Sequence, residues 1–184
     1  MLRFDLDEPT LLAQLTARDA DELFLRIAAD RDRLAEWLPW AERATLAATR
    51  DFCADSLARA DRGDAFDLGI WHEGRLVGVV GTHAMDALNR SASMGYWLTA
   101  EAQGRGLMLR ACTRVLDHCF EERDIHRVEI RVAPRNTRSL ALVRKLGARE
   151  EGRAREAALL RGAYHDLLIF GVLAHEWRGP RDVG

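Results

Sequence analysis

Residues 95–110 read Gly-Tyr-Trp-Leu-Thr-Ala-Glu-Ala-Gln-Gly-Arg-Gly-Leu-Met-Leu-Arg, and this stretch is the strongest indication of the fold. It begins with residues typical of a strand and ends in a helical pattern, with Gly104 and Gly106 between them. Backbone N–H groups at the beginning of a helix lack partners and lie at the positive end of the helix dipole. The stretch therefore predicts an anion-binding loop that suits a pyrophosphate. An ordinary strand-to-helix turn is the alternative interpretation.

The residues on either side extend this alternation of strand and helix. Hydrophobic periodicity predicts strands at 10–15, 66–72, 76–83, 92–98, 127–132, 148–154 and 166–173. It predicts helices around Leu23, Phe24 and Ile27 and at 44–62, 104–122 and 136–146. We therefore expect one α/β (α+β) domain over residues 1–184. Its mixed, mostly antiparallel twisted sheet has about seven strands, with helices on both faces.

The composition excludes several classes of protein. The 184 residues carry 27 basic and 29 acidic side chains, a formal net charge of −2, which disfavours nucleic acid and anionic membranes as partners. No apolar stretch reaches the ~20 residues of a membrane span, and the acidic start lacks a signal pattern, so we expect a cytoplasmic protein. The three cysteines show no C-x-x-C spacing, which argues against disulfides and against a metal site.

A second informative stretch, Asn136-Thr137-Arg138-Ser139, follows the predicted strand that ends near Val132. Asparagine is a preferred N-cap residue, so helix capping alone could explain Asn136. Ser139 lies three residues later and could face the same site.

Together the two stretches resemble the GCN5-related N-acetyltransferase (GNAT) superfamily. The motifs that carry the resemblance are, in chain order, Gly95-Tyr96-Trp97-Leu98, Gln103-x-x-Gly106, Asn136-x-x-Ser139 and Leu146-Gly147. Within the superfamily the chain is similar to the RimJ/RimL type, which acetylates the amino termini of ribosomal proteins. Trp37-Leu38-Pro39-Trp40 and Gly162-Ala163-Tyr164-His165-Asp166 support this similarity.

The resemblance implies acetyl-CoA as cosubstrate and a homodimer. It implies that Trp97 and Leu98 hold the acetyl and pantetheine end through the backbone, and that Asn136 contacts the pantetheine arm. Ser139 should donate a hydrogen bond to the sulfur as the thiolate leaves. The pyrophosphate would be held by the loop residues Gln103, Gly104, Arg105, Gly106, Leu107 and Met108. Arg105, Arg110 and Lys145, the only lysine, could add charge near the CoA phosphates.

Three positions depart from the family pattern. Met108 stands where glycine or alanine is usual, so its side chain must point into the core. Ser93 and Ala158 stand where glutamate is common, so two candidate general bases are missing. Glu156 could replace the second, with a solvated carboxylate on a strand edge as the alternative.

Several other side chains have two interpretations. Trp37, Trp40 and Trp71 could line an acceptor pocket, because aromatic walls exclude water, or they could pack in the core. His72, His83 and His165 could act as bases, although a surface or turn position is the default. Cys112 and Cys119 are spaced for the apolar face of a helix and should be inert core thiols.

A site that is short of a strong base favours an acceptor that is already partly neutral. An α-amino group with a pKa of about 7.7–8.0 meets this condition, whereas a lysine amine at about 10.4 does not. We therefore expect direct transfer of an acetyl group to a protein or peptide amino terminus. A small amine such as a polyamine, aminoglycoside or amino acid is the alternative acceptor. A non-catalytic acyl-CoA-binding module is the alternative from another class.

Overall fold

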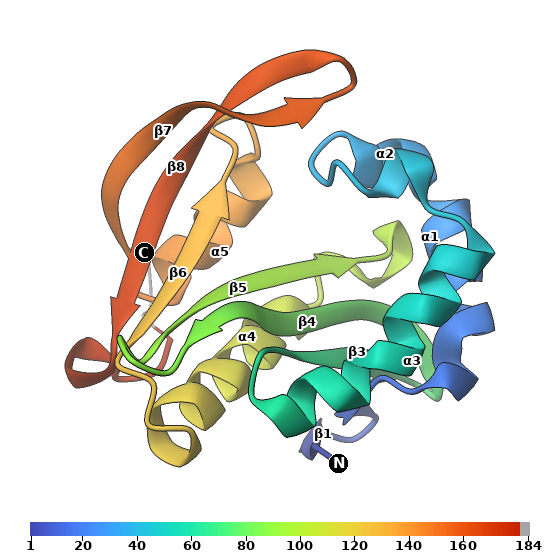
Figure 1. Ribbon diagram of the computed structural model, residues 1–184, viewed down its shortest axis with the longest axis horizontal. Helices are drawn as coiled ribbons and strands as arrows, with labels where there is room; N and C mark the ends of the chain where they lie inside the picture. The colour runs from blue at the N-terminus through green and yellow to red at the C-terminus, as the bar shows by residue number, and fades with distance from the viewer. Residues whose placement is uncertain (181–184) are drawn as a thin grey trace.

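The structure is a computed structural model that describes residues 1–180, and it is built on one eight-stranded sheet (Figure 1). The order across the sheet is β1-β2-β3-β4-β5-β6-β8-β7. The strands are β1 (Arg3–Asp7), β2 (Thr10–Gln14), β3 (Phe66–His72), β4 (Arg75–Asp86), β5 (Ser91–Leu98), β6 (Arg127–Val132), β7 (Arg149–Leu160) and β8 (Ala163–Leu173). Only β5 and β6 pair in parallel; every other neighbouring pair is antiparallel.

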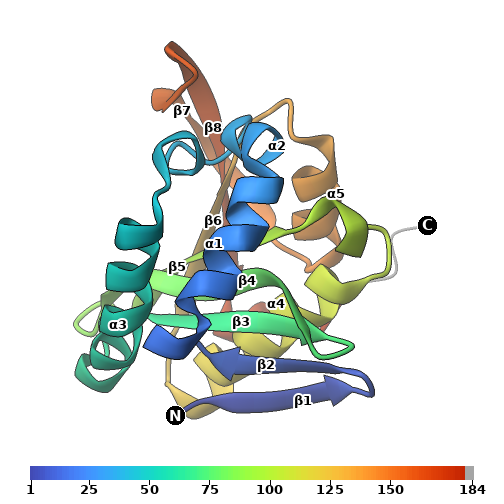
Figure 2. The same cartoon turned by 90° about the vertical axis from the view of Figure 1, so that its right-hand side faces the viewer.

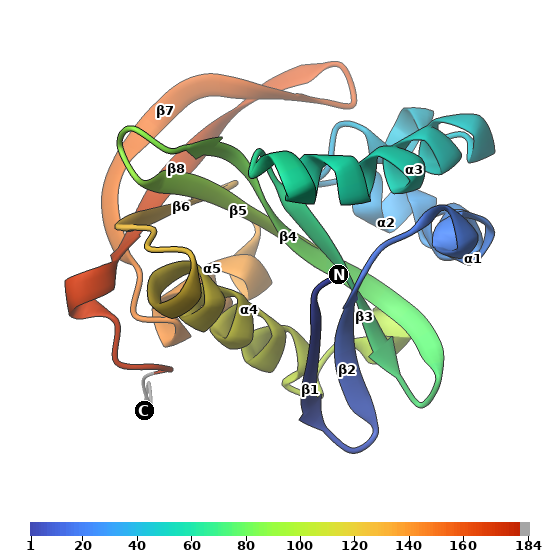
Figure 3. The same cartoon turned by 60° about the horizontal axis from the view of Figure 1, so that its bottom comes forward.

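Helices cover both faces of the sheet. The α-helices are α1 (Ala20–Ala29), α2 (Arg31–Ala35), α3 (Leu46–Arg62), α4 (Leu107–Asp117) and α5 (Thr137–Lys145). Figure 3 shows α4 and α5 on one side of the sheet and α1 and α3 on the other. The inward face of α4 contributes Ala111, Cys112 and Val115 to the main core, all fully buried, because apolar residues recur there at helical spacing.

The strands β5 and β6 separate after a short paired region. Their parallel pairing spans only Ser91 to Ser93 on β5 and Arg127 to Glu129 on β6. Beyond these residues the two strands diverge, and Figure 1 shows the resulting V-shaped opening. The far end of the β7–β8 hairpin arches toward α2 above this opening, and Arg161 donates a hydrogen bond to the Asp32 carbonyl oxygen there, at 2.7 Å.

The expected fold class is confirmed: a mixed, mostly antiparallel sheet with helices on both faces. The count of about seven strands was short by one, because β1 was missed. Figure 2 shows the β1–β2 hairpin extending the sheet beyond β3. Phe4 and Leu6 alternate with charged residues in β1, which is a strand pattern. We did not predict this strand because the segment is rich in acidic residues.

Three further boundaries differ from the expectation. The helix expected from Gly104 begins only at Leu107, because Gly104 and Gly106 have positive φ angles of 78° and 71°. Its end is a π-helical turn, η4 (His118–Glu122). The last two strands, β7 and β8, are longer than predicted, since their outer halves form an exposed hairpin that lacks the hydrophobic pattern of buried strands.

Candidate active site

The open side of β5 presents backbone groups to the gap between β5 and β6. Thr99 N–H donates to the Val77 carbonyl oxygen at 2.8 Å, and Trp97 lies opposite Val79 on β4. Because backbone groups alternate in direction along a strand, Trp97 and Thr99 face β4, whereas Tyr96 and Leu98 face the gap. The register therefore turns the backbone of Tyr96, rather than that of Trp97, toward the gap together with Leu98, and contact of these groups with an acyl-CoA stays a prediction.

The end of β5 is fixed by an ion pair from the α1–α2 region. Arg33 donates to the Leu98 carbonyl oxygen at 2.6 Å and to the Asp30 carboxylate at 2.7 Å. The same carboxylate accepts from the Ala100 N–H at 2.6 Å. Since the Leu98 carbonyl is occupied in this way, its N–H is the group that Leu98 offers to the gap.

The glycine-rich loop is open to solvent on its outer side. A side chain added at Gly104 would meet nothing within 4 Å. Gly106 is the N-cap residue of α4, and no side chain caps this helix within residues 1–180. The Met108 side chain packs against the main core, which is the direction expected if a phosphate is to approach the loop. These features leave the first turn of α4 accessible to a phosphate group.

Three basic residues expected or found near the loop differ in how close they lie to it. Arg110 donates to the Arg105 carbonyl oxygen at 3.2 Å and pairs with Asp7 at 3.2 Å, so it braces the loop. Arg138 donates to the Gln103 side chain, which links the loop to α5. Lys145 is exposed at the far end of α5, roughly 13 Å along the helix axis from its first turn.

The first turn of α5 lies beside β5. The Asn136 side chain accepts the Ser139 N–H at 3.1 Å, which is a helix N-cap. The Ser139 hydroxyl lies 2.7 Å from the Tyr96 hydroxyl. Burial raises the pKa of Tyr96 above its usual value, so the phenol stays protonated and can donate a hydrogen bond.

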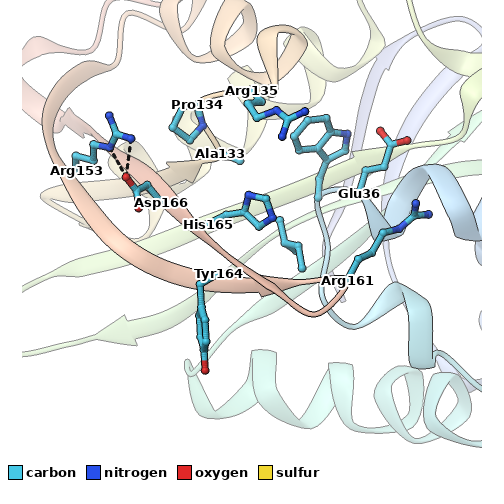
Figure 4. Close-up of a pocket in the computed structure, with 11 residues that line it drawn as sticks. Glu36, Ala133, Pro134, Arg135, Arg153, Arg161, Tyr164, His165 and Asp166 are labelled. Carbon is cyan, nitrogen blue, oxygen red and sulfur yellow. Dashed lines mark hydrogen bonds and ion pairs between the residues drawn. The ribbon is translucent and has the colours of Figure 1, made fainter.

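A cavity of about 680 Å³ lies above the gap (Figure 4). Its walls come from the end of α2, from the loop after β6 and from the β7–β8 hairpin. The lining residues are Glu36, Trp37, Ala133, Pro134, Arg135, Arg153, Leu160, Arg161, Tyr164, His165 and Asp166. The loop after β6 runs directly into the Asn136 cap of α5, so one wall of the cavity is continuous in sequence with the first turn of α5.

The charged residues of the cavity are only partly paired. Arg153 and Asp166 form an ion pair at 2.6 Å, drawn in Figure 4. Arg161 lies 3.9 Å from the Asp32 carboxylate. Among the residues that the structure describes, Glu36 and Arg135 form no ion pair.

The three candidate acceptor tryptophans are not brought together. Trp37 lines the cavity, whereas Trp40 is partly exposed and its ring lies 6.3 Å from that of Trp97. Trp71 packs against the hydrophobic cluster formed by α1 and α3 with β3 and β4, and it lies outside the cavity lining. Its position fits the core alternative.

Glu156 occupies a bulge of β7 rather than the cavity wall. Its φ angle is 50°, and its N–H donates to the Asp166 carboxylate at 2.8 Å. The side chain is exposed. Glu156 therefore touches the cavity only through Asp166, and its role as a base stays a prediction.

The candidate histidines and cysteines differ in their surroundings. His165 lines the cavity, and His72 is hydrogen-bonded to Thr10 at 2.9 Å. Burial lowers the pKa of His83.

All three thiols are buried, and burial raises the pKa of Cys53 to about 11 and that of Cys119 to about 12, which keeps them protonated. Within residues 1–180 no three His, Cys, Asp or Glu side chains are grouped as metal ligands.

Four residues of the site were missed by sequence reasoning. Tyr96 belongs to the quoted motif, but only the strand register turns its backbone and hydroxyl toward α5. Arg33, Glu36 and Arg135 carry no sequence signal, because charged residues in helices and loops are usually solvated.

Within the described residues 1–180, no helix is long and apolar enough to span a membrane.

Comparisons with known proteins agree with this geometry. A family model described as "Acetyltransferase (GNAT) domain" matches residues 10–149. The chain is 33% identical to "Putative ribosomal N-acetyltransferase YdaF" of Bacillus subtilis (strain 168), over 98% of this chain and 100% of that protein. It is 28% identical to "Ribosomal-protein-serine acetyltransferase" of Escherichia coli (strain K12), over 66% and 68%.

A solved structure has a similar fold. "Mycobacterium smegmatis RimJ in complex with CoA-disulfide" superposes with a TM-score of 0.84 at 30% identity. The match covers 91% of this chain and 83% of that one.

Proposed function

Because this chain belongs to the GNAT family of acetyltransferases, we propose that it transfers the acetyl group of acetyl-CoA to the α-amine of a protein or peptide amino terminus. The observation that carries the proposal is the gap between β5 and β6, where free backbone groups meet the uncapped first turn of α4. The names of the relatives, which refer to ribosomal proteins, support an amino terminus of a ribosomal protein as the acceptor.

The residues of the gap fit an acyl-CoA. The first turn of α4, opened by Gly104 and Gly106, would bind the pyrophosphate through backbone N–H groups. Tyr96 and Leu98 would bind the pantetheine arm and the thioester through backbone groups on the open side of β5. Asn136 caps α5 through its side-chain oxygen, so its amide nitrogen is the atom left for the pantetheine arm.

The proposed chemistry is direct transfer. The neutral amine attacks the thioester carbonyl carbon, a C–N bond forms and the C–S bond breaks. The Leu98 N–H faces the gap and would stabilise the oxyanion that develops on the carbonyl oxygen. The Ser139 hydroxyl, hydrogen-bonded to Tyr96, would donate a hydrogen bond to the leaving thiolate, which departs as the anion and takes any proton from solvent. The amine's own proton leaves through water or through a weak base at the cavity, for which Glu156 stays a candidate.

The cavity supports a peptide over a polyamine as acceptor. It has room for several residues of an extended chain, and its walls include three arginines against two carboxylates. A polycation would find only one carboxylate there that is not already paired with an arginine, that of Glu36. A homodimer, which the family resemblance implies, and a cytoplasmic location, expected from the sequence, are part of the proposal.

The test is thiol release from acetyl-CoA with a panel of acceptors. The panel contains peptides with varied first residues, the same peptides blocked at the amino terminus, polyamines, aminoglycosides and free amino acids. We expect turnover with unblocked peptides and a kcat/KM that rises with pH to a plateau set by the acceptor's pKa. Higher kcat/KM on small amines would move the acceptor to that class, and no turnover with any amine would favour the acyl-CoA-binding module.

A further inference from the structure

We infer that the cavity selects amino termini that carry a carboxylate side chain within the first few residues, with Arg135 as the residue that binds it. This inference rests on the proposed function and names the acceptor class more narrowly. Arg135 is distinguished from the other cations of the cavity because those already have partners within the protein.

Most of the cavity's charges have partners within the protein. Arg153 and Asp166 neutralise each other at 2.6 Å. Arg161 donates to the Asp32 carbonyl oxygen at 2.7 Å, and the Asp32 carboxylate lies 3.9 Å away. Within the described residues this leaves one cation, Arg135, and one anion, Glu36, without an ion pair among the charges that line the cavity.

The two unpaired charges stand on different walls. Glu36 follows the last turn of α2, and Arg135 lies in the loop between β6 and α5. Figure 4 shows both side chains at the same end of the cavity. A ligand that satisfies both charges must carry a cation and an anion. An amino-terminal peptide with an acidic side chain meets this condition, whereas a polyamine does not.

The position of Arg135 limits where the carboxylate can be. Arg135 directly precedes Asn136, whose side chain caps the Ser139 N–H, and the Ser139 hydroxyl is the proposed hydrogen-bond donor to the thiolate. Because Arg135 adjoins this first turn of α5 and an extended peptide advances about 3.3–3.6 Å per residue, we place the acid at the second or third residue. Glu36 would attract the ammonium form as the peptide enters, before the amine loses its proton.

The test uses matched peptides that differ only in charge. Each pair carries aspartate or asparagine at position two, three or six, and acetylation is measured as kcat/KM at pH 7.5. For the wild-type protein we expect a preference for aspartate of about fivefold at position two or three and none at position six. The preference should be smaller in high salt, because the Arg135 side chain is exposed.

Two variants decide the assignment. Arg135→Gln should abolish the aspartate preference, so that kcat/KM is about equal for the two peptides of each pair. On the asparagine peptides its kcat/KM should stay within about twofold of the wild-type value. Arg155→Gln is the matched control, because Arg155 is an exposed cation of β7 outside the cavity lining, and it should keep the preference. Free aspartate and glutamate are included to show whether an α-carboxylate can replace the side chain.

The outcomes separate this inference from the proposed function. Turnover of peptides with no preference for aspartate, or a preference that survives Arg135→Gln, would overturn the inference and leave the function standing. Absence of turnover with every peptide would overturn both. Equal kcat/KM on free acidic amino acids would assign Arg135 to an α-carboxylate and overturn the peptide class.

Discussion

At the scale of single residues, the hydroxyl pair of Tyr96 and Ser139 distinguishes this site from an ordinary strand-to-helix packing. The two oxygens lie 2.7 Å apart, and burial keeps the phenol protonated. If Ser139 donates a hydrogen bond to the leaving thiolate, its interaction is made mainly in the transition state. Ser139→Ala should then lower kcat about tenfold or more, while the Kd for acetyl-CoA changes little.

Tyr96→Phe tests the same pair from the other side. We expect a smaller loss of kcat, because the Ser139 hydroxyl remains, and we expect the two substitutions to be non-additive in the double variant. Additive losses would show that the two hydroxyl groups act independently. A lower Tm with unchanged turnover per folded molecule would assign Ser139 to helix capping alone.

Arg33 is a positioning residue, since it reaches the site only through the Leu98 carbonyl. Arg33→Met removes two short hydrogen bonds that hold the end of β5, and we expect kcat to fall about three- to tenfold. Arg31→Met is the matched control, because Arg31 donates to three backbone carbonyls of residues 41, 42 and 44 at 2.9–3.0 Å, away from β5. Equal losses of kcat in both variants would mean that Arg33 only stabilises the fold.

At the scale of elements, the first turn of α4 makes a prediction about ligand binding. Gly104 and Gly74 both have positive φ angles, of 78° and 73°, and an added side chain at either one meets nothing within 4 Å. Substitution by glutamate therefore has a similar conformational cost at both, about 1 kcal/mol. Only Gly104→Glu places a carboxylate beside the proposed phosphate site.

Calorimetry of acetyl-CoA binding to the two glycine variants separates these effects. We expect Gly104→Glu to weaken binding at least tenfold, while Gly74→Glu, in the β3–β4 turn, binds as the wild type does and has a similar Tm. Unchanged binding by folded Gly104→Glu would remove the pyrophosphate from this loop.

At the scale of the whole molecule, His118 couples three elements and makes stability depend on pH. It is buried in the π-helical turn after α4, and its ring contacts Phe4 of β1 and Phe66 of β3. Burial lowers the pKa of His118 in the folded state, although Glu122 partly opposes this shift. The unfolded chain therefore binds a proton more readily, and stability falls as the pH drops below about 6.5.

We expect the Tm to decrease between pH 7.5 and pH 5, a range above that in which the carboxylates titrate. His118→Gln should flatten this dependence, whereas His175→Gln, an exposed position, should not. A Tm profile of His118→Gln that is as steep as that of the wild type would assign the pH dependence to other groups, of which His83, whose pKa is also lowered, is the first candidate.

The fold class, the glycine-rich loop and the capped helix at Asn136 could all be predicted from the order of residues along the chain. These features are local: glycine permits the positive φ angles at 104 and 106, asparagine caps a helix, and hydrophobic period separates strands from helices. The family resemblance depended on the same local motifs.

The tertiary structure alone decided which groups meet. Strand register turns Tyr96 rather than Trp97 toward the gap, and the divergence of β5 from β6 after Ser93 creates that gap. The cavity brings Glu36 and Arg135 together from segments about a hundred residues apart in the chain. No local pattern encodes such contacts, because they depend on the twist of the sheet and on the long β7–β8 hairpin that closes over α2.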